Sequence, residues 1–131
     1  MSKFKYNMNE ERRNELLKLN TGVDYQRFDM ERFEDLTVED FGTLLAEKFI
    51  DPRDKQNKAP TAIEFYRFMQ RYPQFKAHGY AVSKDRIDYR ITIEGLQGVT
   101  MSDEGVQMFA NTFTNADDFR IDGGYCYCWY D

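Results

Sequence analysis

The spacing of the apolar side chains changes near residue 73, and this change limits the possible folds more than any other feature. Before it, from Val38 to Tyr72, apolar residues recur every three or four positions. After it, from Ile87 to Ile93, every second residue is apolar and the residues between are polar. The first period is typical of amphipathic helices and the second of a strand with one buried face. We therefore expect an α+β protein, with helices first and antiparallel strands after them.

The N-terminal part is expected to contain three helices. The first spans about residues 9–19, with acidic residues in its first turn, where they favour the helix dipole, and a glycine after its end. Thr37 and Thr61 are candidate N-caps of the second and third helices, and Pro52 follows the second. Residues 23–36 carry aromatic side chains without a clear period, so they fit either a short helix or a packed loop.

The alternating segment is expected to form the first of two β-hairpins. Residues 75–82 are its expected partner, and residues 87–93 are the second strand, across a short polar turn. In that register His78 and Tyr80 share a face with Tyr89. The small residues between them then line the opposite face, where another backbone can approach closely.

A fourth helix is expected between the two hairpins. Gly95 and Gly98 are expected to end the preceding strand, and Ser102 is a candidate N-cap. Beyond this helix, an Asp-Gly-Gly turn joins expected strands at about 118–121 and 125–130. The expected architecture is an antiparallel sheet of about four strands with the helices packed on it.

The length and composition fit one globular domain of 131 residues, with a helical part over about 1–73 and a sheet-containing part over about 74–131. The 11 Phe, 9 Tyr and single Trp supply much of the apolar area that a core needs. No stretch is long and apolar enough to span a membrane, and the N-terminus lacks the apolar centre of a signal peptide. Because there are only 2 cysteines, we expect no disulfide framework and a reducing, cytoplasmic location.

The formal net charge of −5 is unevenly distributed. Residues 21–40 carry a net charge of −5 and residues 91–131 carry −6, whereas the remainder of the chain is positive. Such asymmetry is typical of an interaction surface, although acids in these numbers also serve simply to keep separate elements solvated. Direct binding of nucleic acid is not expected, because an acidic chain repels phosphates outside any local basic patch.

The C-terminal hairpin has two chemically different faces. Because side chains alternate along a strand, the two turn registers that fit the sequence give the same division. One face carries Phe119, Ile121, Cys126, Cys128 and Tyr130, and the other carries Asp118, Arg120, Asp122, Tyr125, Tyr127 and Trp129. Exposed aromatic and arginine side chains are typical anchors of interfaces, so the second face is the candidate binding site. The alternative arrangement, with this face beneath helices and the cysteines outside, remains open at this point.

Few residues can carry catalysis or bind a metal. Cys126 and Cys128 form a Cys-x-Cys pair, but a zinc site usually needs four ligands and His78 is the only histidine. No glycine motif for binding phosphates occurs. We therefore expect no metal, no cofactor and no catalytic residue. The alternative is an enzyme of unrecognised type that uses His78 with surrounding carboxylates.

Together these features predict a non-catalytic protein that binds another protein. The expected binding residues are Tyr125, Tyr127 and Trp129 as anchors, with Arg120 beside them and charges from Asp117, Asp118, Asp122 and Asp131. One specific form is an inhibitor whose carboxylates stand in for phosphates on a basic surface of a nucleic-acid-handling complex. In composition, though not in any motif, the chain resembles small acidic phage-encoded inhibitors of nucleases, which include anti-CRISPR proteins. A structural or assembly subunit that self-associates is a further alternative.

Overall fold

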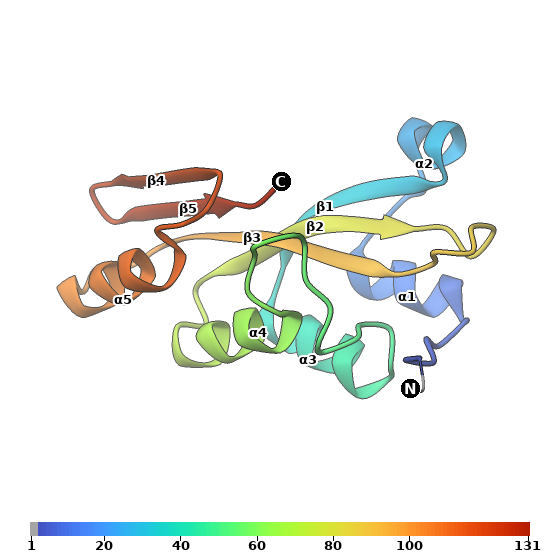
Figure 1. The fold of residues 1–131 in the computed structure, drawn as a ribbon, viewed down its shortest axis with the longest axis horizontal. Helices are drawn as coiled ribbons and strands as arrows, with labels where there is room; N and C mark the ends of the chain where they lie inside the picture. The colour runs from blue at the N-terminus through green and yellow to red at the C-terminus, as the bar shows by residue number, and fades with distance from the viewer. Residues whose placement is uncertain (1–2) are drawn as a thin grey trace.

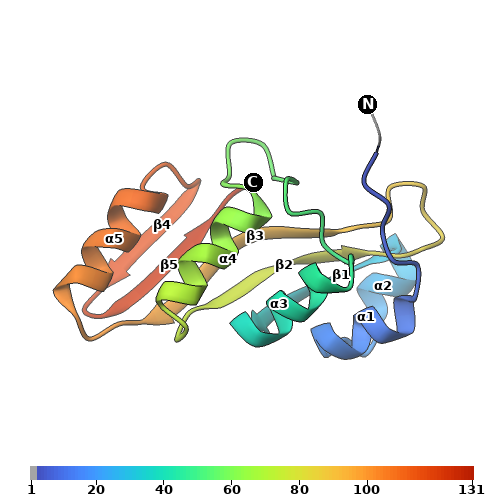
Figure 2. The same ribbon diagram turned by 90° about the horizontal axis from the view of Figure 1, so that it is seen from below.

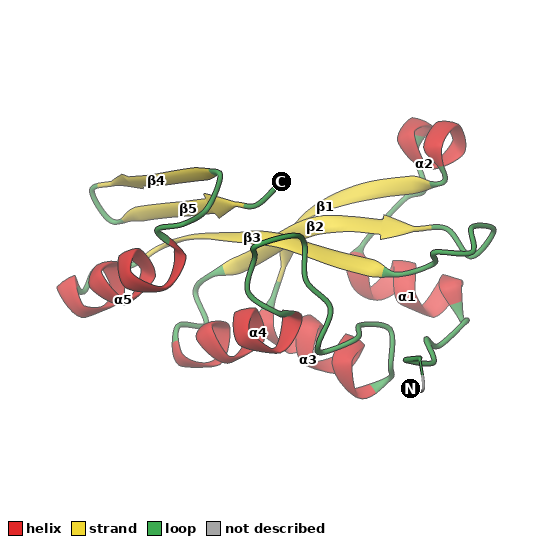
Figure 3. Cartoon of the chain, in the orientation of Figure 1, coloured by secondary structure: helices red, strands yellow, loops and turns green. Residues whose placement is uncertain are grey.

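The fold is built on one five-stranded antiparallel sheet with the strand order β1-β2-β3-β5-β4 (Figure 3). The structure is a computed structural model and describes residues 3–131. In chain order the elements are α1 (Glu10–Leu17), α2 (Val23–Phe28), β1 (Met30–Leu36), α3 (Val38–Ala46), α4 (Ala62–Arg71), β2 (Lys76–Val82), β3 (Ile91–Val99), α5 (Asp103–Phe113), β4 (Asp118–Asp122) and β5 (Tyr125–Trp129). The expected α+β class is confirmed, but the sheet has five strands instead of about four.

The helices begin at the capping residues that the sequence indicates. Thr37, Thr61 and Ser102 each accept a hydrogen bond from the backbone N–H three residues later, at the starts of α3, α4 and α5. Asn9 caps α1 in the same way. This helix ends earlier than expected, because Lys18 adopts a left-handed backbone conformation with a φ of 58°. Helix α3 also ends before the proline that was expected to terminate it.

Helices α1, α3, α4 and α5 lie on one face of the sheet, as Figures 1 and 2 show. The short helix α2 lies next to the start of β1, at one end of the sheet. Within residues 3–131, no helix covers the middle of the opposite face. We call this opposite side the open face; its side chains include Arg32, His78, Tyr80, Thr92, Gln97, Tyr125, Tyr127 and Trp129.

Aromatic rings fill the layer between the helices and the sheet. Phe65 of α4 stacks on Phe113 of α5 with ring centroids 5.6 Å apart, and Phe75 stacks on Phe109 at 5.4 Å. All four rings are fully buried. Ring pairs in such arrangements add about 0.5–1.5 kcal/mol each to the stabilisation that comes from area burial. Much of the aromatic content of the chain therefore lies in this core.

Strand β1 is the element that the sequence analysis did not predict. It pairs antiparallel with β2, so that Phe33 lies opposite Gly79. The register then shifts before Leu36, and Phe33 and Leu36 both face the core although they are three residues apart. This irregularity breaks the alternation of apolar residues. The sequence of the segment therefore lacks the two-residue period that predicts a strand. The sheet consequently includes a strand from the part of the chain that was expected to be helical.

The connection between β2 and β3 occupies residues 83–90, where a strand was expected to begin. Asp88 forms ion pairs with Arg86 at 2.7 Å and with Arg90 at 2.8 Å, and these contacts hold the segment as a loop. Ile87 consequently points into solvent and is fully exposed. The alternation of residues 87–90 thus belongs to a loop held by ion pairs. The expectation of a strand there is wrong.

A β-bulge at Glu94 exchanges the faces of β3. Gly79 of β2 pairs with Ile93 and the preceding residue pairs with Gly95, which leaves Glu94 as the additional residue. Ile93 packs in the core before the bulge, and Leu96 packs there after it. The expectation that Gly95 ends the strand is also wrong, because pairing continues through it and onward to Val99, with β5 as the second partner.

Candidate binding site on the open face

The C-terminal hairpin closes through the loop Gly123-Gly124, because Asp122 pairs with Tyr125. Gly123 has a φ of +63°, a conformation that L side chains rarely adopt. This loop sets the register of β4 against β5, and the register determines which side chains face the helices. The expected hairpin is therefore confirmed, including its turn.

The two faces of the hairpin lie in different environments. Cys126, Cys128 and Tyr130 are fully buried and belong to the core. Tyr125 is 40% exposed, and Tyr127 and Trp129 are half-buried on the open face. Of the two arrangements that composition left open, the structure has the one with the cysteines inside and the aromatic row accessible.

The edge strand β4 adds a pair of charged side chains to this row. Asp118 and Arg120 form an ion pair at 2.8 Å, with the arginine largely exposed. The guanidinium of Arg120 also lies 5.2 Å from the centre of the Tyr127 ring, which is a cation–π contact. Exposed ion pairs contribute only about 0–1 kcal/mol to stability. Their main effect here is to orient the Arg120 side chain beside the aromatic row.

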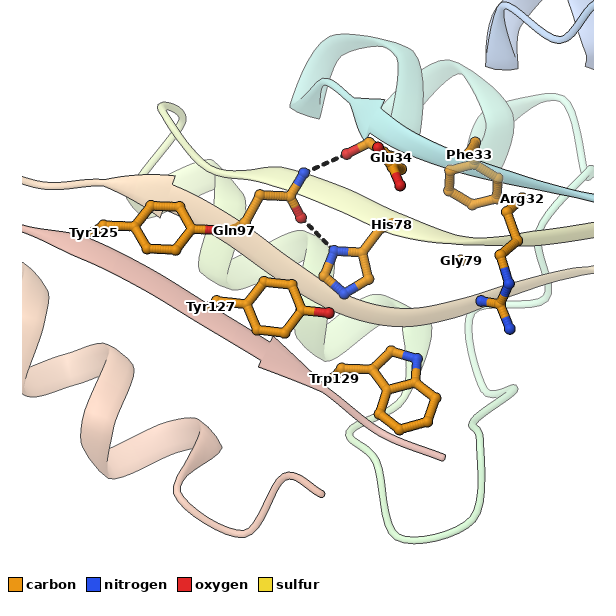
Figure 4. Close-up of a pocket in the computed structure, with 9 residues that line it drawn as sticks. All are labelled: Arg32, Phe33, Glu34, His78, Gly79, Gln97, Tyr125, Tyr127 and Trp129. Carbon is orange, nitrogen blue, oxygen red and sulfur yellow. Dashed lines mark hydrogen bonds between the residues drawn. The ribbon is translucent and has the colours of Figure 1, made fainter. Parts of the chain in front are cut away.

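His78 stacks on Tyr127, with ring centroids 5.2 Å apart and an angle of 14° between the planes (Figure 4). Nδ1 of His78 is hydrogen-bonded to the amide oxygen of Gln97, and the amide nitrogen of Gln97 donates to the backbone carbonyl of Glu34. Because that carbonyl can only accept, the amide oxygen must face the imidazole, and this network assigns the proton to Nδ1. His78 shares no face with Tyr89, contrary to expectation, because Tyr89 lies in the loop before β3.

The second ring nitrogen of His78, Nε2, is buried and has no hydrogen-bond partner among the residues that the structure describes. Gly95 lies directly below it: a Cβ at that position would be 2.5 Å from Nε2 and 1.9 Å from the carbonyl oxygen of Cys128. Burial lowers the pKa of His78 from its usual value of 6.5, and the interactions with Gln97 and with the backbone of Cys128 offset only part of this effect. The imidazole is therefore neutral at pH 7, with Nε2 packed against Gly95 and the Cys128 carbonyl.

Arg32 and Glu94 form an ion pair across the open face at 2.5 Å. The glutamate side chain is only 3% exposed, whereas the arginine side chain is 57% exposed. Burial raises the pKa of Glu94, and the neighbouring guanidinium of Arg32 and the indole of Trp129 act in the opposite direction. The carboxylate is thus a buried acceptor whose charge partner lies mostly at the surface.

These groups surround a pocket of about 260 Å³ on the open face (Figure 4). The lining residues are Arg32, Phe33, Glu34, His78, Gly79, Gln97, Tyr125, Tyr127 and Trp129. They come from β1, β2, β3 and β5, so the pocket extends across most of the sheet. In Figure 4 the side chains of Arg32 and Trp129 extend toward each other from opposite sides, with His78 and Tyr127 beside them. The arrangement can hold a flat group against the Trp129 ring, close to the ion pair of Arg32 with Glu94.

The structure brings only part of the expected binding residues to this pocket. Tyr125, Tyr127 and Trp129 line it, and Asp118 and Arg120 flank it on β4. Asp117 is turned toward Lys58, with which it pairs at 3.3 Å, and it accepts a hydrogen bond from the backbone of Asp131. Asp122 lies at the hairpin turn and has no ion-pair partner within the described part of the chain.

Several residues that line the pocket or lie beside it were not predicted from the sequence. Arg32 and Glu34 belong to β1, and the short run of a charged, an aromatic and a charged residue around Phe33 was their only local signal. Glu94 and Gln97 reach the open face because of the bulge in β3, which no pattern in the sequence revealed. His78 was considered from the sequence as a catalytic residue, as a zinc ligand and as part of a strand face, but not as a binding residue.

Among the residues described, neither a metal-binding cluster nor a reactive thiol supports a chemical function at this site. No group of three or more His, Cys, Asp or Glu side chains within residues 3–131 is arranged to hold a metal ion. Cys126 and Cys128 are free thiols. Burial raises the pKa of Cys128 to about 12 and also raises that of Cys126, so both are protonated at pH 7.

The fold and pocket thus define a small α+β protein with one helix-covered and one open sheet face. Comparisons with protein-family models, with curated proteins and with solved structures find no match for the chain. Within the described residues, no helix is long and apolar enough to cross a membrane. The function is therefore argued below from the geometry of the open face.

Proposed function

We propose that this is a non-catalytic binding protein that docks on another protein through its open face. The observation that carries the proposal is the row of Tyr125, Tyr127 and Trp129, half accessible on a sheet face that no described helix covers. Tyrosine, tryptophan and arginine are the residues that most often dominate binding energies at interfaces. Because a sheet holds these side chains in place, docking costs little conformational entropy.

The charges around the pocket favour a basic partner. Three basic side chains here are already paired, Arg32 with Glu94, Arg120 with Asp118 and Lys58 with Asp117, whereas Lys76 beside Gln97 has no ion-pair partner among the described side chains. Glu34, Asp122 and Asp131 have no ion-pair partner among the described side chains, so the surplus charge is negative. Complementary charge steers association and disfavours wrong partners.

In its specific form, the proposal is an inhibitor that covers a basic nucleic-acid-binding surface of a nuclease or of another nucleic-acid-handling protein. The net charge of −5 and the acids beside the aromatic row support this form, because carboxylates can take the places of phosphates. A phage-encoded inhibitor such as an anti-CRISPR protein is one example of this class. The free thiols of Cys126 and Cys128 support action in a reducing cytoplasm.

A pair of charge-reversed variants tests this proposal. The partner is first identified by affinity capture and cross-linking from the source cell and then purified. The double change Asp118→Lys and Asp122→Lys on β4 is expected to weaken binding about tenfold or more, with most of the change in the association rate.

The matched control is Glu11→Lys with Glu15→Lys, which makes the same change in charge on exposed positions of α1, on the opposite side of the sheet. This control should change the affinity less than about threefold, by a general electrostatic effect alone. Equal losses in both double variants, or no loss in the β4 variant, would rule out the open face as the docking surface.

An enzyme that uses His78 is the alternative, and the observation that favours it is the unpartnered Nε2. The change His78→Ala separates the two functions. If the protein is an enzyme, this variant loses its biological effect while still binding the partner, because a catalytic group contributes to rate more than to affinity.

A further alternative, self-assembly, is favoured by the position of β4 at the edge of the sheet, where it pairs only with β5. An edge strand can add a strand from a second copy. Light scattering over a hundredfold range of concentration distinguishes self-assembly from docking by a single chain. A constant mass of 15.6 kDa excludes assembly, and a mass that rises with concentration supports it.

A further inference from the structure

We propose that the pocket between Arg32, His78 and Trp129 receives the guanidinium group of an arginine side chain from the partner protein, which displaces Arg32 from Glu94. The inference rests on the proposed docking through the open face and names the group that the pocket recognises. It follows from what the pocket already binds, from its aromatic walls and from its charge.

A guanidinium group, that of Arg32, already forms part of the pocket wall. Arg32 lies on Glu94 at 2.5 Å, so the position and orientation of this carboxylate suit a guanidinium donor. More than half of the Arg32 side chain is exposed, whereas Glu94 is almost completely buried. Because Glu94 is buried, it must keep a positive partner, and an incoming guanidinium can supply one while the Arg32 side chain moves into solvent. We therefore regard Arg32 as the occupant of the site in the free protein.

The walls of the pocket suit a planar cation better than a compact one. Trp129 presents a ring surface on which a guanidinium can stack while its N–H groups remain free to donate, whereas the Tyr127 ring is already in contact with His78 and Arg120. His78 contributes to the wall as a neutral ring, because its Nε2 is packed against Gly95 and the Cys128 carbonyl and its Nδ1 is hydrogen-bonded to Gln97. A guanidinium has five N–H donors in a planar fork, which suits the carboxylate of Glu94. A lysine ammonium cannot stack in this way.

The charge of the pocket excludes an anionic occupant. An anion would have to bind Arg32, the only basic residue in the lining, whose charge Glu94 already neutralises. It would also lie close to Glu34, which lines the pocket, and to Asp131, whose charge acts on Glu94. These acids attract a cation, so a cationic occupant is favoured.

The experiment uses the isolated protein and N-acetylarginine amide as the probe. Trp129 is the only tryptophan, so its fluorescence and the NMR signal of its indole N–H report on the pocket alone. Both signals should change in a saturable way with the arginine probe. N-acetyllysine amide should bind about tenfold more weakly, because an ammonium cannot stack on the ring or offer a planar fork of donors to the carboxylate. Acetate should produce no saturable change.

Two variants that should change the affinity for the arginine probe in opposite directions make the test specific. Glu94→Gln should weaken binding of the arginine probe about tenfold, because it removes the charge but keeps the shape. Arg32→Gln should tighten binding about threefold or more, because it removes the competing guanidinium. Glu104→Gln, an exposed acid on α5, is the matched control and should leave binding unchanged.

The outcomes separate this inference from the proposed function. If the arginine probe gives no saturable change at Trp129, or if Arg32→Gln abolishes binding, the inference is overturned; the second result would mean that Arg32 binds the ligand itself. If Glu94→Gln does not fold, the sign of the Arg32→Gln effect still decides. If the probe binds as expected but variants of β4 keep full affinity for the partner, then the pocket is confirmed and docking through the open face is wrong.

Discussion

The imidazole of His78 is the group whose protonation most directly determines what the pocket can accept. Its Nδ1 proton is committed to Gln97, and Nε2 is buried without a donor. The neutral ring therefore adds no charge to the pocket wall, whereas a protonated ring would repel a cation. The property of the pocket thus depends on burial keeping this one ring neutral.

We predict that His78 titrates with a midpoint below 6.5, because burial lowers its pKa. A base with a lowered pKa in the folded state binds fewer protons there than in the unfolded chain. Its contribution to the free energy of unfolding is therefore complete above about pH 6.5 and decreases as the pH falls below that value, until the folded protein is also protonated. His78 is the only histidine, so one NMR titration of the ring protons gives the midpoint.

The thermodynamic side of this prediction needs a comparison, because carboxylates titrate in the same range. Between pH 7 and pH 5, the free energy of unfolding should fall further in the natural protein than in His78→Gln. A midpoint above 6.5 in the folded protein, or an identical pH dependence in both, would show that the imidazole is not held neutral by burial.

The thiols of Cys126 and Cys128 should be unreactive in the folded protein. Both are fully buried, and burial raises the pKa of Cys128 to about 12, so neither exposure nor the thiolate form is available. Iodoacetamide at pH 8 should label neither residue in buffer and both in denaturant, as mass spectrometry would show. Rapid labelling without denaturant would mean that the cysteine face of the hairpin is outside.

At the scale of elements, the bulge in β3 is the feature that builds the pocket. It directs Glu94 toward Arg32 and brings Gln97 opposite Tyr127, while Leu96 returns to the core. Without the additional residue, the alternation that buries Ile93 would continue and turn Gln97 toward the helices. The pocket therefore depends on an irregularity of the sheet.

We predict that Gly95→Ala destabilises the protein by about 1–3 kcal/mol, because the added carbon would lie 1.9 Å from the carbonyl oxygen of Cys128 and 2.5 Å from His78. The backbone contact cannot be relieved by a rotamer change, so β3 and β5 must separate. Urea unfolding measures this loss. The same substitution at Gly42 in α3 is the control: it meets only the hydroxyl end of Tyr66 and should be close to neutral. Equal stability of both variants would contradict the described packing at the bulge.

How well each element could be predicted depends on whether its signal is local. Caps such as Thr37 and Thr61, and the turn at Gly123, act within a few residues, so their helices and hairpin were predicted correctly. Strand β1 and the continuation of β3 through Gly95 depend on pairing with distant strands and on bulges, which shift the alternation that reveals a strand. The aromatic row of the candidate site lies on the hairpin, whose signal is local, so it was predicted. Its neighbours Arg32 and Glu94 lie on β1 and at the bulge of β3, so they were not.

At the scale of the whole molecule, the helices and the aromatic core lie on one side of the sheet and the candidate binding groups on the other. The core rings stabilise the sheet from behind, and the open face carries exposed charges, a pocket and half-accessible rings. This separation means that open-face side chains can be changed with little effect on the core. Variants on this face therefore test binding more directly than folding.

The affinity of the Trp129→Ala variant for the purified partner tests the central claim most directly. Trp129 combines the largest ring on the open face with a place in the pocket wall, so its loss should weaken binding about thirtyfold or more. Met101→Ala, which removes an exposed apolar side chain outside the pocket, is the control and should change the affinity less than about twofold. Titration calorimetry of both folded variants gives the comparison. A Trp129→Ala variant that binds as tightly as the Met101→Ala control would contradict docking through the open face.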